Sequence, residues 1–186
     1  MRIIGIDPGT ICCGYGIVER RVKSQESGKN PKLLTHNSKL QYIIAGDVKL
    51  NKKDPLPERL KILYESLCAI VDEYTPTHLS LEKIFYHKSI RSAFALGSAR
   101  GVVLLLAAQY NLPVFEYNPT EVKMALTGYG RAEKRQVQEM VKIILDLKSS
   151  PLTFSEDSTD SLALCICHIN LSSFKRRDSE CNGPMG

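Results

Sequence analysis

Four carboxylates stand where apolar segments of the sequence begin or end. Asp7 follows the apolar run that opens the chain, and Glu82 follows a second, shorter apolar run. Asp157 and Asp160 come just before a later apolar stretch. A fold brings residues at the ends of core elements to a common edge, so we expect the four acids to converge.

The hydrophobic pattern predicts five strands and five helices. The predicted strands span residues 1–6, 14–22, 41–50, 77–81 and 114–117. The predicted helices span residues 55–74, 92–110, 120–126, 132–147 and 155–171. A three-stranded meander followed by alternating helix and strand predicts an α/β fold: a mixed five-stranded sheet with helices on both faces.

This layout is ribonuclease H-like, and it predicts where the acids lie. The first strand lies beside the fourth, which places Asp7 and Glu82 on neighbouring strands roughly 5 Å apart. Asp157 and Asp160 are three residues apart and share one face of a helix. If that helix covers the same end of the sheet, all four acids meet there.

Such a cluster predicts a metal-dependent nuclease. Carboxylates within ~5 Å of one another repel by about 3 kcal/mol per pair at an effective dielectric near 20. Without cations, some of them would have to stay protonated. A set of oxygen ligands selects magnesium or manganese over zinc. Two such ions ~3.5–4 Å apart activate water and stabilise the leaving oxygen when a phosphodiester is cut.

Each acid also has a simpler explanation. Asp7 could cap its own turn, Glu82 could pair with Lys83, and Asp157 suits the first turn of a helix. Asp160 is harder to explain in this way, because the helix after it is apolar almost all round. A buried carboxylate needs a partner.

Aromatic and basic residues follow Glu82 directly and predict contacts with DNA. The candidates are Phe85, Tyr86, Lys88 and Arg91. Rings stack on unpaired bases, and cations hold phosphates. The alternative is that Phe85 is a core residue at the end of a strand.

A second basic cluster surrounds the Thr-Gly-Tyr-Gly turn at 127–130 and contains Lys123, Arg131, Lys134, Arg135 and Lys142. Backbone amides and a helix N-terminus near this turn would also receive a phosphate. The alternative is an ordinary solvated helix surface.

Composition limits the remaining choices. The 186 residues are expected to form one domain, 1–174, with an enlarged hairpin loop at 23–39 and a loose tail at 175–186. A net charge of +5 suits a polyanionic partner without proving one. The six cysteines form no CxxC pair, which is typical of reduced thiols in a cytoplasmic protein. No signal peptide or continuous apolar run long enough for a membrane is evident, so no membrane contact is expected.

Several strings, in this order, resemble the RuvC family of bacterial Holliday-junction resolvases. They are IIGIDPGT, GYGIV, LSLEKIFYHKSIRSAFALGSARGV, LPVFEYNPTEVKMALTGYGRAEKRQVQEMV and DSTDSLALCICH. The resemblance runs from residue 1 to about 168 and includes the spacings. It implies a homodimeric endonuclease of recombination and repair that nicks opposing strands of four-way junction DNA symmetrically. It also implies Mg²⁺, two ions per subunit with Mn²⁺ as a substitute, and a branch-migration motor of RuvA and RuvB type.

The resemblance assigns roles to particular residues. The metal-binding, catalytic acids of the family fall on Asp7, Glu82, Asp157 and Asp160. Its stacking phenylalanine falls on Phe85, its DNA-contacting lysines on Lys123 and Lys134, and its dimerisation helix on the one containing Gly97 and Gly101.

The sequence also departs from the family. Some members carry histidine at the position of Asp157, and Ser158, Thr159 and Ser161 stand where alanines are usual. The loop 23–39 is longer than the family's hairpin. Two rival readings are a nucleotide-binding module of the actin-like ATPase type, for which the chain is too short, and a YqgF-type relative acting on RNA. The basic and aromatic residues after Glu82 favour the junction resolvase.

Overall fold

The structure, a computed structural model, describes residues 1–21, 39–83, 90–147 and 153–181. For Arg91 and for residues 173–181 it describes the backbone alone. Most of the loop predicted at 23–39 lies outside the described residues, as do Phe85, Tyr86 and Lys88.

Five strands form one mixed sheet, with β1 beside β4 as predicted, in the order β3-β2-β1-β4-β5. They are β1 (Arg2–Asp7), β2 (Cys12–Arg21), β3 (Lys39–Lys49), β4 (His78–Glu82) and β5 (Val114–Tyr117). The first three pair antiparallel, whereas β4 runs parallel to both β1 and β5. The central strand β1 therefore joins the meander to the parallel part of the sheet.

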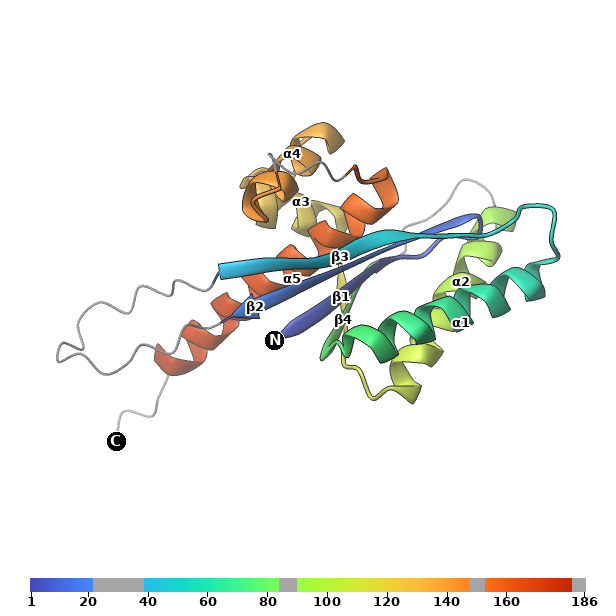
Figure 1. Cartoon of the computed structure of the whole chain (residues 1–186). Helices are drawn as coiled ribbons and strands as arrows, with labels where there is room; N and C mark the ends of the chain where they lie inside the picture. Colours follow the sequence, from blue (N-terminus) through green and yellow to red (C-terminus); the bar gives the residue numbers. More distant parts are fainter. Residues whose placement is uncertain (22–38, 84–89, 148–152, 182–186) are drawn as a thin grey trace.

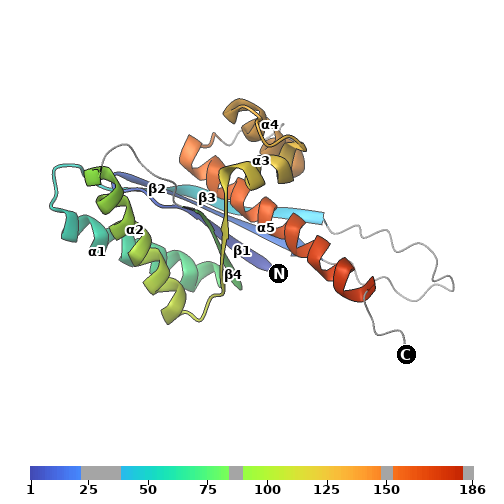
Figure 2. The ribbon, with the colours of Figure 1, turned by 180° about the vertical axis from the view of Figure 1, so that it is seen from behind.

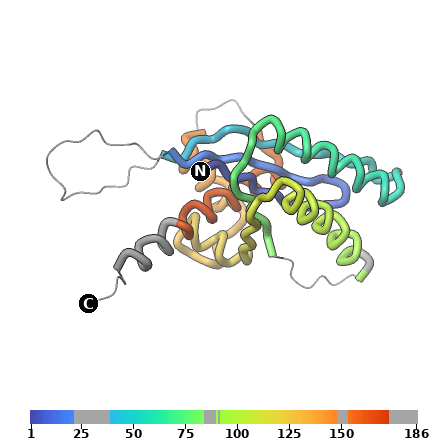
Figure 3. The backbone as a smooth tube through the Cα atoms, turned by 90° about the horizontal axis from the view of Figure 1, so that it is seen from below, coloured from blue at the N-terminus to red at the C-terminus, as the bar shows by residue number. Residues whose placement is uncertain are grey.

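Helices cover both faces of this sheet (Figures 1 and 2). They are α1 (Leu56–Tyr74), α2 (Ile90–Gln109), α3 (Pro119–Thr127), α4 (Lys134–Ile144) and α5 (Glu156–Cys181). Helices α1 and α2 lie side by side on one face (Figure 3), and α3, α4 and α5 form the layer on the other.

The alternation of side chains along the strands produces two separate cores. Ile4 and Ile6 of β1 and Ile17 of β2 are buried in the core beneath α1 and α2. Ile3 and Val18, each one position away, are buried in the core beneath α3, α4 and α5. Successive residues of a strand point to opposite faces, so short apolar runs such as β1 supply both cores.

Glycines let α5 lie directly on the middle of the sheet. A Cβ atom at Gly14 of β2 would stand 2.2 Å from the carbonyl oxygen of Asp157, and one at Gly5 of β1 would stand 2.0 Å from that of Ser161. Larger residues at these positions would push the helix away. The start of α5 is therefore held at the edge of the sheet where β1 ends.

Some element ends differ from the prediction. Helix α5 continues to Cys181, past the predicted end at 171 and into the segment 175–186 that was predicted to be a loose tail. No proline or glycine interrupts the sequence there before Gly183, so nothing stops the helix. Helix α4 ends at Ile144 rather than at the predicted residue 147. Two residues after its end, Asp146 takes a positive φ of 58°, which a right-handed helix does not contain.

Candidate metal and nucleic-acid site

The topology brings the four acids to one edge of the sheet, as the sequence predicts. Asp7 is the last residue of β1 and Glu82 the last of β4; the preceding residues of the two strands, Ile6 and Leu81, are paired in register. Asp157 and Asp160 lie in the first turns of α5.

Burial and mutual repulsion perturb three of these carboxyl groups. The pKa of Asp7 is raised from its ordinary 3.8 to about 7, mainly by burial and then by the charges of Asp160, Glu82 and Asp157. The pKa of Glu82 is raised by burial and by Asp160. Burial also raises the pKa of Asp160. The site therefore has more negative charge than its surroundings neutralise.

Lys134, at the first position of α4, supplies a cation to this edge. Its Nζ lies 3.0 Å from Oδ2 of Asp160 and 3.0 Å from Oε2 of Glu156. Burial alone would lower the pKa of Lys134, but the bonds to these two carboxylates raise it. Together with Lys123, Lys134 also acts to lower the pKa of Glu82. Two of the predicted DNA-contacting lysines thus face the acids.

A pocket opens beside these groups, with a volume of about 220 Å³. Glu82 and Asp160 line it on the acidic side, Lys123 and Lys134 provide the cations, and apolar residues of α3, α4 and α5 form the rest of the wall. A groove with acids and cations next to each other suits a phosphate that must be held close to a metal ion.

The donor set fits a divalent cation in chemistry and charge. All four candidate ligands are carboxylates, which hard divalent ions prefer. Among the residues that the structure describes, however, no three His, Cys, Asp or Glu side chains are grouped closely enough to hold one ion. Asp160 instead contacts the ammonium of Lys134. A metal ion bound here would replace Lys134 as the counter-charge of Asp160 and draw the carboxylates together.

The other residues predicted to contact DNA lie away from this pocket or outside the described residues. Arg135 lines a second cavity, of about 460 Å³, together with Tyr129 and Glu139. Arg131 is exposed. Arg91 lies in the first turn of α2, but its side chain is not described. The basic cluster predicted around the 127–130 turn therefore divides: Lys123 and Lys134 approach the acids, whereas Lys142 pairs with Glu139.

One anchoring contact escaped the sequence-based prediction. Asp47 of β3 pairs with Gly14 of β2, which in turn pairs with Asp7. The hydroxyl of Ser155 donates a hydrogen bond to Asp47 Oδ1 at 2.6 Å and accepts one from the backbone N–H of Ser158 at 3.0 Å. Ser155 thus caps α5 and ties it to the sheet. The available signals were a serine just before the helix and an acid within a predicted strand.

Three hydroxyl residues near the start of α5 form their hydrogen bonds within the helix. Thr159 and Ser161 donate to backbone carbonyl oxygens four residues earlier, those of Ser155 and Asp157, at 2.7 and 2.9 Å. Ser158 donates to the carbonyl of Ser155 at 3.2 Å. These buried hydroxyl groups are satisfied within the helix itself.

Comparison with known proteins identifies the family. The sequence model described as "Crossover junction endodeoxyribonuclease RuvC" matches residues 3–168. The chain belongs to the RuvC family. A RuvC from Pseudothermotoga lettingae is 40% identical over 179 residues, covering 96% of this chain and all of the relative. RuvC proteins are metal-dependent nucleases, which agrees with a cluster of carboxylates.

Solved structures agree with the fold. The RuvC structure from Thermus thermophilus superposes with a TM-score of 0.77 at 28% identity, covering 94% of this chain and 97% of that one. The same protein in complex with a Holliday junction substrate gives a TM-score of 0.77 at 26% identity, with coverage of 94% and 96%. The mixed sheet with helices on both faces is the ribonuclease H-like fold.

The raised pKa of Asp7 gives a prediction for stability. The folded chain holds this proton up to about pH 7, whereas the unfolded chain releases it near pH 4. The metal-free protein should therefore lose stability as pH rises from 4 to 7. Asp7→Asn should flatten this dependence and raise Tm at pH 8 by about 2–4 °C per kcal/mol gained when the buried charge and its repulsion are removed.

The measurement is thermal unfolding in chelator across this pH range. Glu65→Gln is the control, because Glu65 is exposed on α1 and pairs with Lys61. A Tm at pH 8 that does not change in Asp7→Asn would show that the Asp7 charge does not destabilise the folded protein.

Proposed function

We propose that this RuvC-family chain resolves four-way DNA junctions by cutting two opposing strands, in recombination and repair. We assign Asp7, Glu82, Asp157 and Asp160 as its metal ligands and catalytic residues. The observation that supports the assignment most strongly is the convergence of four acids from three elements at one sheet edge, where burial raises the pKa values of Asp7, Glu82 and Asp160.

The ions proposed are two Mg²⁺ per subunit, for which Mn²⁺ substitutes. When bound, they supply an acidified water for attack on phosphorus and charge that stabilises the leaving oxygen. The chain's own part is to hold oxygen ligands on rigid supports: two strand ends and a capped helix that lies against the sheet. Lys134, released from Asp160 by the metal, becomes available to a phosphate.

Contacts with the junction follow from the positions of the cations. Lys123 and Lys134 line the acidic pocket, so we assign them to phosphates near the cut bond. Arg131 and Arg135 lie away from this pocket, and we assign them to phosphates of the DNA arms. Phe85 and Tyr86 remain predicted stacking residues, and Lys88 and Arg91 predicted phosphate contacts, on the strength of the sequence.

The proposed functional unit is a homodimer that uses α2. Paired cuts need two sites, and one chain supplies one. Ile90, Phe94 and Leu105 expose 72%, 74% and 56% of their surface on this helix. Apart from the helix itself, no described residue lies within 4 Å of where a Cβ of Gly97 or Gly101 would be. A second copy would cover this face by packing α2 against its counterpart across a two-fold axis.

Helix α2 is also, within the described residues, the one segment long and apolar enough to cross a membrane. That indication is weak, because a core helix passes the same test. Ala99, Val103 and Leu106 of α2 are fully buried beside α1 and the sheet, so the helix is part of the domain. We therefore propose a cytoplasmic protein without a membrane partner, which works with a motor of RuvA and RuvB type.

Changing a catalytic carboxylate to the matching amide should abolish cutting. Asp7→Asn and Glu82→Gln should cut a labelled mobile four-way junction more than about 100-fold slower than the parent in Mg²⁺, since even outer partners of a metal are worth 10–100-fold. Junction binding should remain or strengthen, because less negative charge faces the phosphates. Glu65→Gln is the matched control.

The same assay tests substrate class and metal. The parent should prefer the junction over linear duplex and structured RNA, and excess chelator should stop cutting. Near-parental cutting by Asp7→Asn would remove the acids from the mechanism, and a preference for RNA would favour the YqgF-type alternative.

Removing either lysine should weaken binding and its dependence on salt. For Lys123→Ala and Lys134→Ala, each lost phosphate contact should lower the slope of log affinity against log salt by about 0.9. At saturating protein, cutting should largely recover. Lys61→Ala on α1 is the control, since Lys61 pairs with Glu65 on the opposite helical layer. Parental slopes for both variants would make this cluster an ordinary solvated surface.

Charge on the exposed face of α2 should break the dimer. Leu105→Glu should give a monomer in size-exclusion chromatography with light scattering, because a carboxylate would be buried without a partner. Gly97→Leu should weaken association by separating the two helices. Ile62→Glu, at a 40% exposed position on α1, should leave the dimer intact. A tight dimer of Leu105→Glu would place the interface elsewhere.

A further inference from the structure

A half-buried arginine joins α2 to the strand end that carries Glu82. Arg100 Nη1 donates a hydrogen bond to the backbone carbonyl of Glu82 at 3.0 Å, and Nη2 forms an ion pair with the carboxylate of Glu116 on β5. The Arg100 side chain is only 12% exposed. Both contacts are charge-assisted. The contact with the Glu82 carbonyl is partly buried, whereas the Glu116 side chain is 38% exposed.

These contacts fix the peptide group next to the Glu82 side chain. The N–H of Lys83, on the other side of the same peptide, donates to the carbonyl of Tyr117 at 2.9 Å. Both polar groups of this planar unit are therefore held, one by Arg100 and one by β5. The Cα atom of Glu82 belongs to this unit, so these contacts fix the point from which the Glu82 side chain extends.

Arg100 also lies at the border between the two faces of α2. At 100° per residue, it falls between the buried Val103 and the open position of Gly97. A helix that packed on Gly97 and Gly101 would adjoin the stem of Arg100. The residue thus connects the exposed apolar face of α2 with the edge of the sheet where the acids meet.

We propose that Arg100 is a positioning residue that couples the packing of α2 in the dimer to the placement of the Glu82 carboxylate. The inference rests on the proposed function for the roles of Glu82 and of the dimer. A subunit outside the dimer would let α2 and Arg100 shift, and so hold metal less well. Single, unpaired cuts would then be suppressed until two subunits are assembled.

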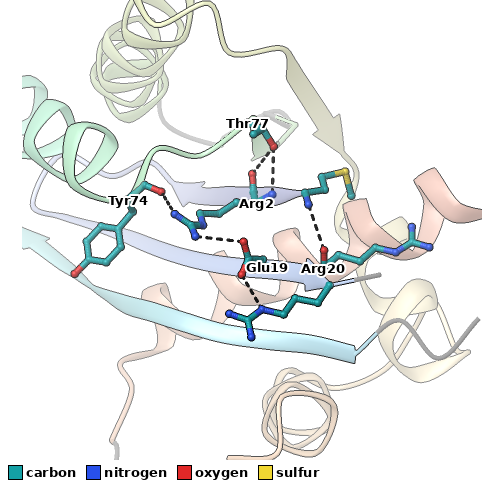
Figure 4. Close-up of polar contacts among 7 residues, drawn as sticks. Arg2, Glu19, Arg20, Tyr74 and Thr77 are labelled. Atoms are coloured by element: carbon teal, nitrogen blue, oxygen red, sulfur yellow. Dashed lines mark hydrogen bonds and ion pairs between the residues drawn. The ribbon is translucent and has the colours of Figure 1, made fainter. Parts of the chain in front are cut away.

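The chain contains a matched control at the far end of β1. Arg2 Nη1 donates to the backbone carbonyl of Tyr74 at 2.5 Å, and its Nη2 lies 3.2 Å from Glu19 (Figure 4). Its chemistry is the same as that of Arg100, one carbonyl and one glutamate, with a side chain that is 30% exposed. Asp7 stands at the opposite end of the strand from Arg2.

The test compares Arg100→Met with Arg2→Met in the full chain. The readouts are Mg²⁺ affinity by calorimetry without DNA, junction affinity, and the cutting rate at saturating protein, all below the Tm of each variant. Arg100→Met should weaken Mg²⁺ binding and slow cutting by about 10-fold or more, as outer partners of metal sites do. Junction affinity should stay within about two-fold of the parent, since the phosphate contacts remain. Arg2→Met should lower Tm but leave Mg²⁺ affinity, junction affinity and the cutting rate unchanged.

Coupling to the dimer is tested by adding Leu105→Glu. Alone, this change should weaken Mg²⁺ binding; combined with Arg100→Met it should add little, because both act through one connection. Arg100→Lys should recover part of the loss. If Arg100→Met fails to fold, Arg100→Lys and Glu116→Gln serve in its place.

Two outcomes would overturn the inference. The first is Mg²⁺ affinity and cutting in the Arg100 variants equal to those of Arg2→Met. The second is a loss of Mg²⁺ affinity on adding Leu105→Glu to Arg100→Met that equals the loss caused by Leu105→Glu alone. Failure of the proposed function itself is distinguishable, because the parental protein would then bind no Mg²⁺ or leave the junction uncut.

Discussion

The burial of several carboxylates at one edge of the sheet is the constraint on which the rest of this structure depends. Burial first, and then the charges of the neighbouring acids, raise the pKa of Asp7 to about 7, so without a counter-charge these groups would take up protons or move apart. They stay together because each is fixed through the backbone: two by the register of β1 and β4, and one by a helix that lies directly on Gly14. The fold therefore gathers carboxylates whose charge a bound cation would balance.

Three polar contacts brace this arrangement from outside the cluster. Ser155 and Asp47 hold the start of α5. Lys134 forms an ion pair with Asp160, and Arg100 fixes the peptide after Glu82. Each bracing residue comes from a different element. A site supported in this way on rigid elements limits the reorganisation needed when metal and DNA bind.

Much of the fold was readable in the sequence, because it depends on local periodicity. The apolar runs before Asp7 and Glu82 gave the strands whose ends carry the acids, and the spacing of Asp157 and Asp160 gave their common helical face. The predicted end of α5 was wrong. Its last turns are polar and suggested a tail, but no residue in them breaks a helix. Domain limits and the roles of the acids stay predictions.

The bracing contacts could not be predicted from local sequence patterns. Ser155 and Asp47 are 108 residues apart, and Lys134 meets Asp160 across two helices, so only the packed structure brings them together. Arg100 gave no signal in a helix whose apolar residues dominate the pattern. Its neighbours in space, Glu82 and Glu116, lie on strands before and after it.

The central claim is that a divalent ion takes the place of the Lys134 ammonium among these acids. Crystals of the full chain soaked in Mn²⁺ test it directly, through the anomalous scattering of the metal. The account predicts Mn²⁺ in contact with Asp7 and Glu82, and Lys134 moved away from Asp160. Saturating Mn²⁺ that binds elsewhere while Lys134 keeps its contact with Asp160 would contradict it.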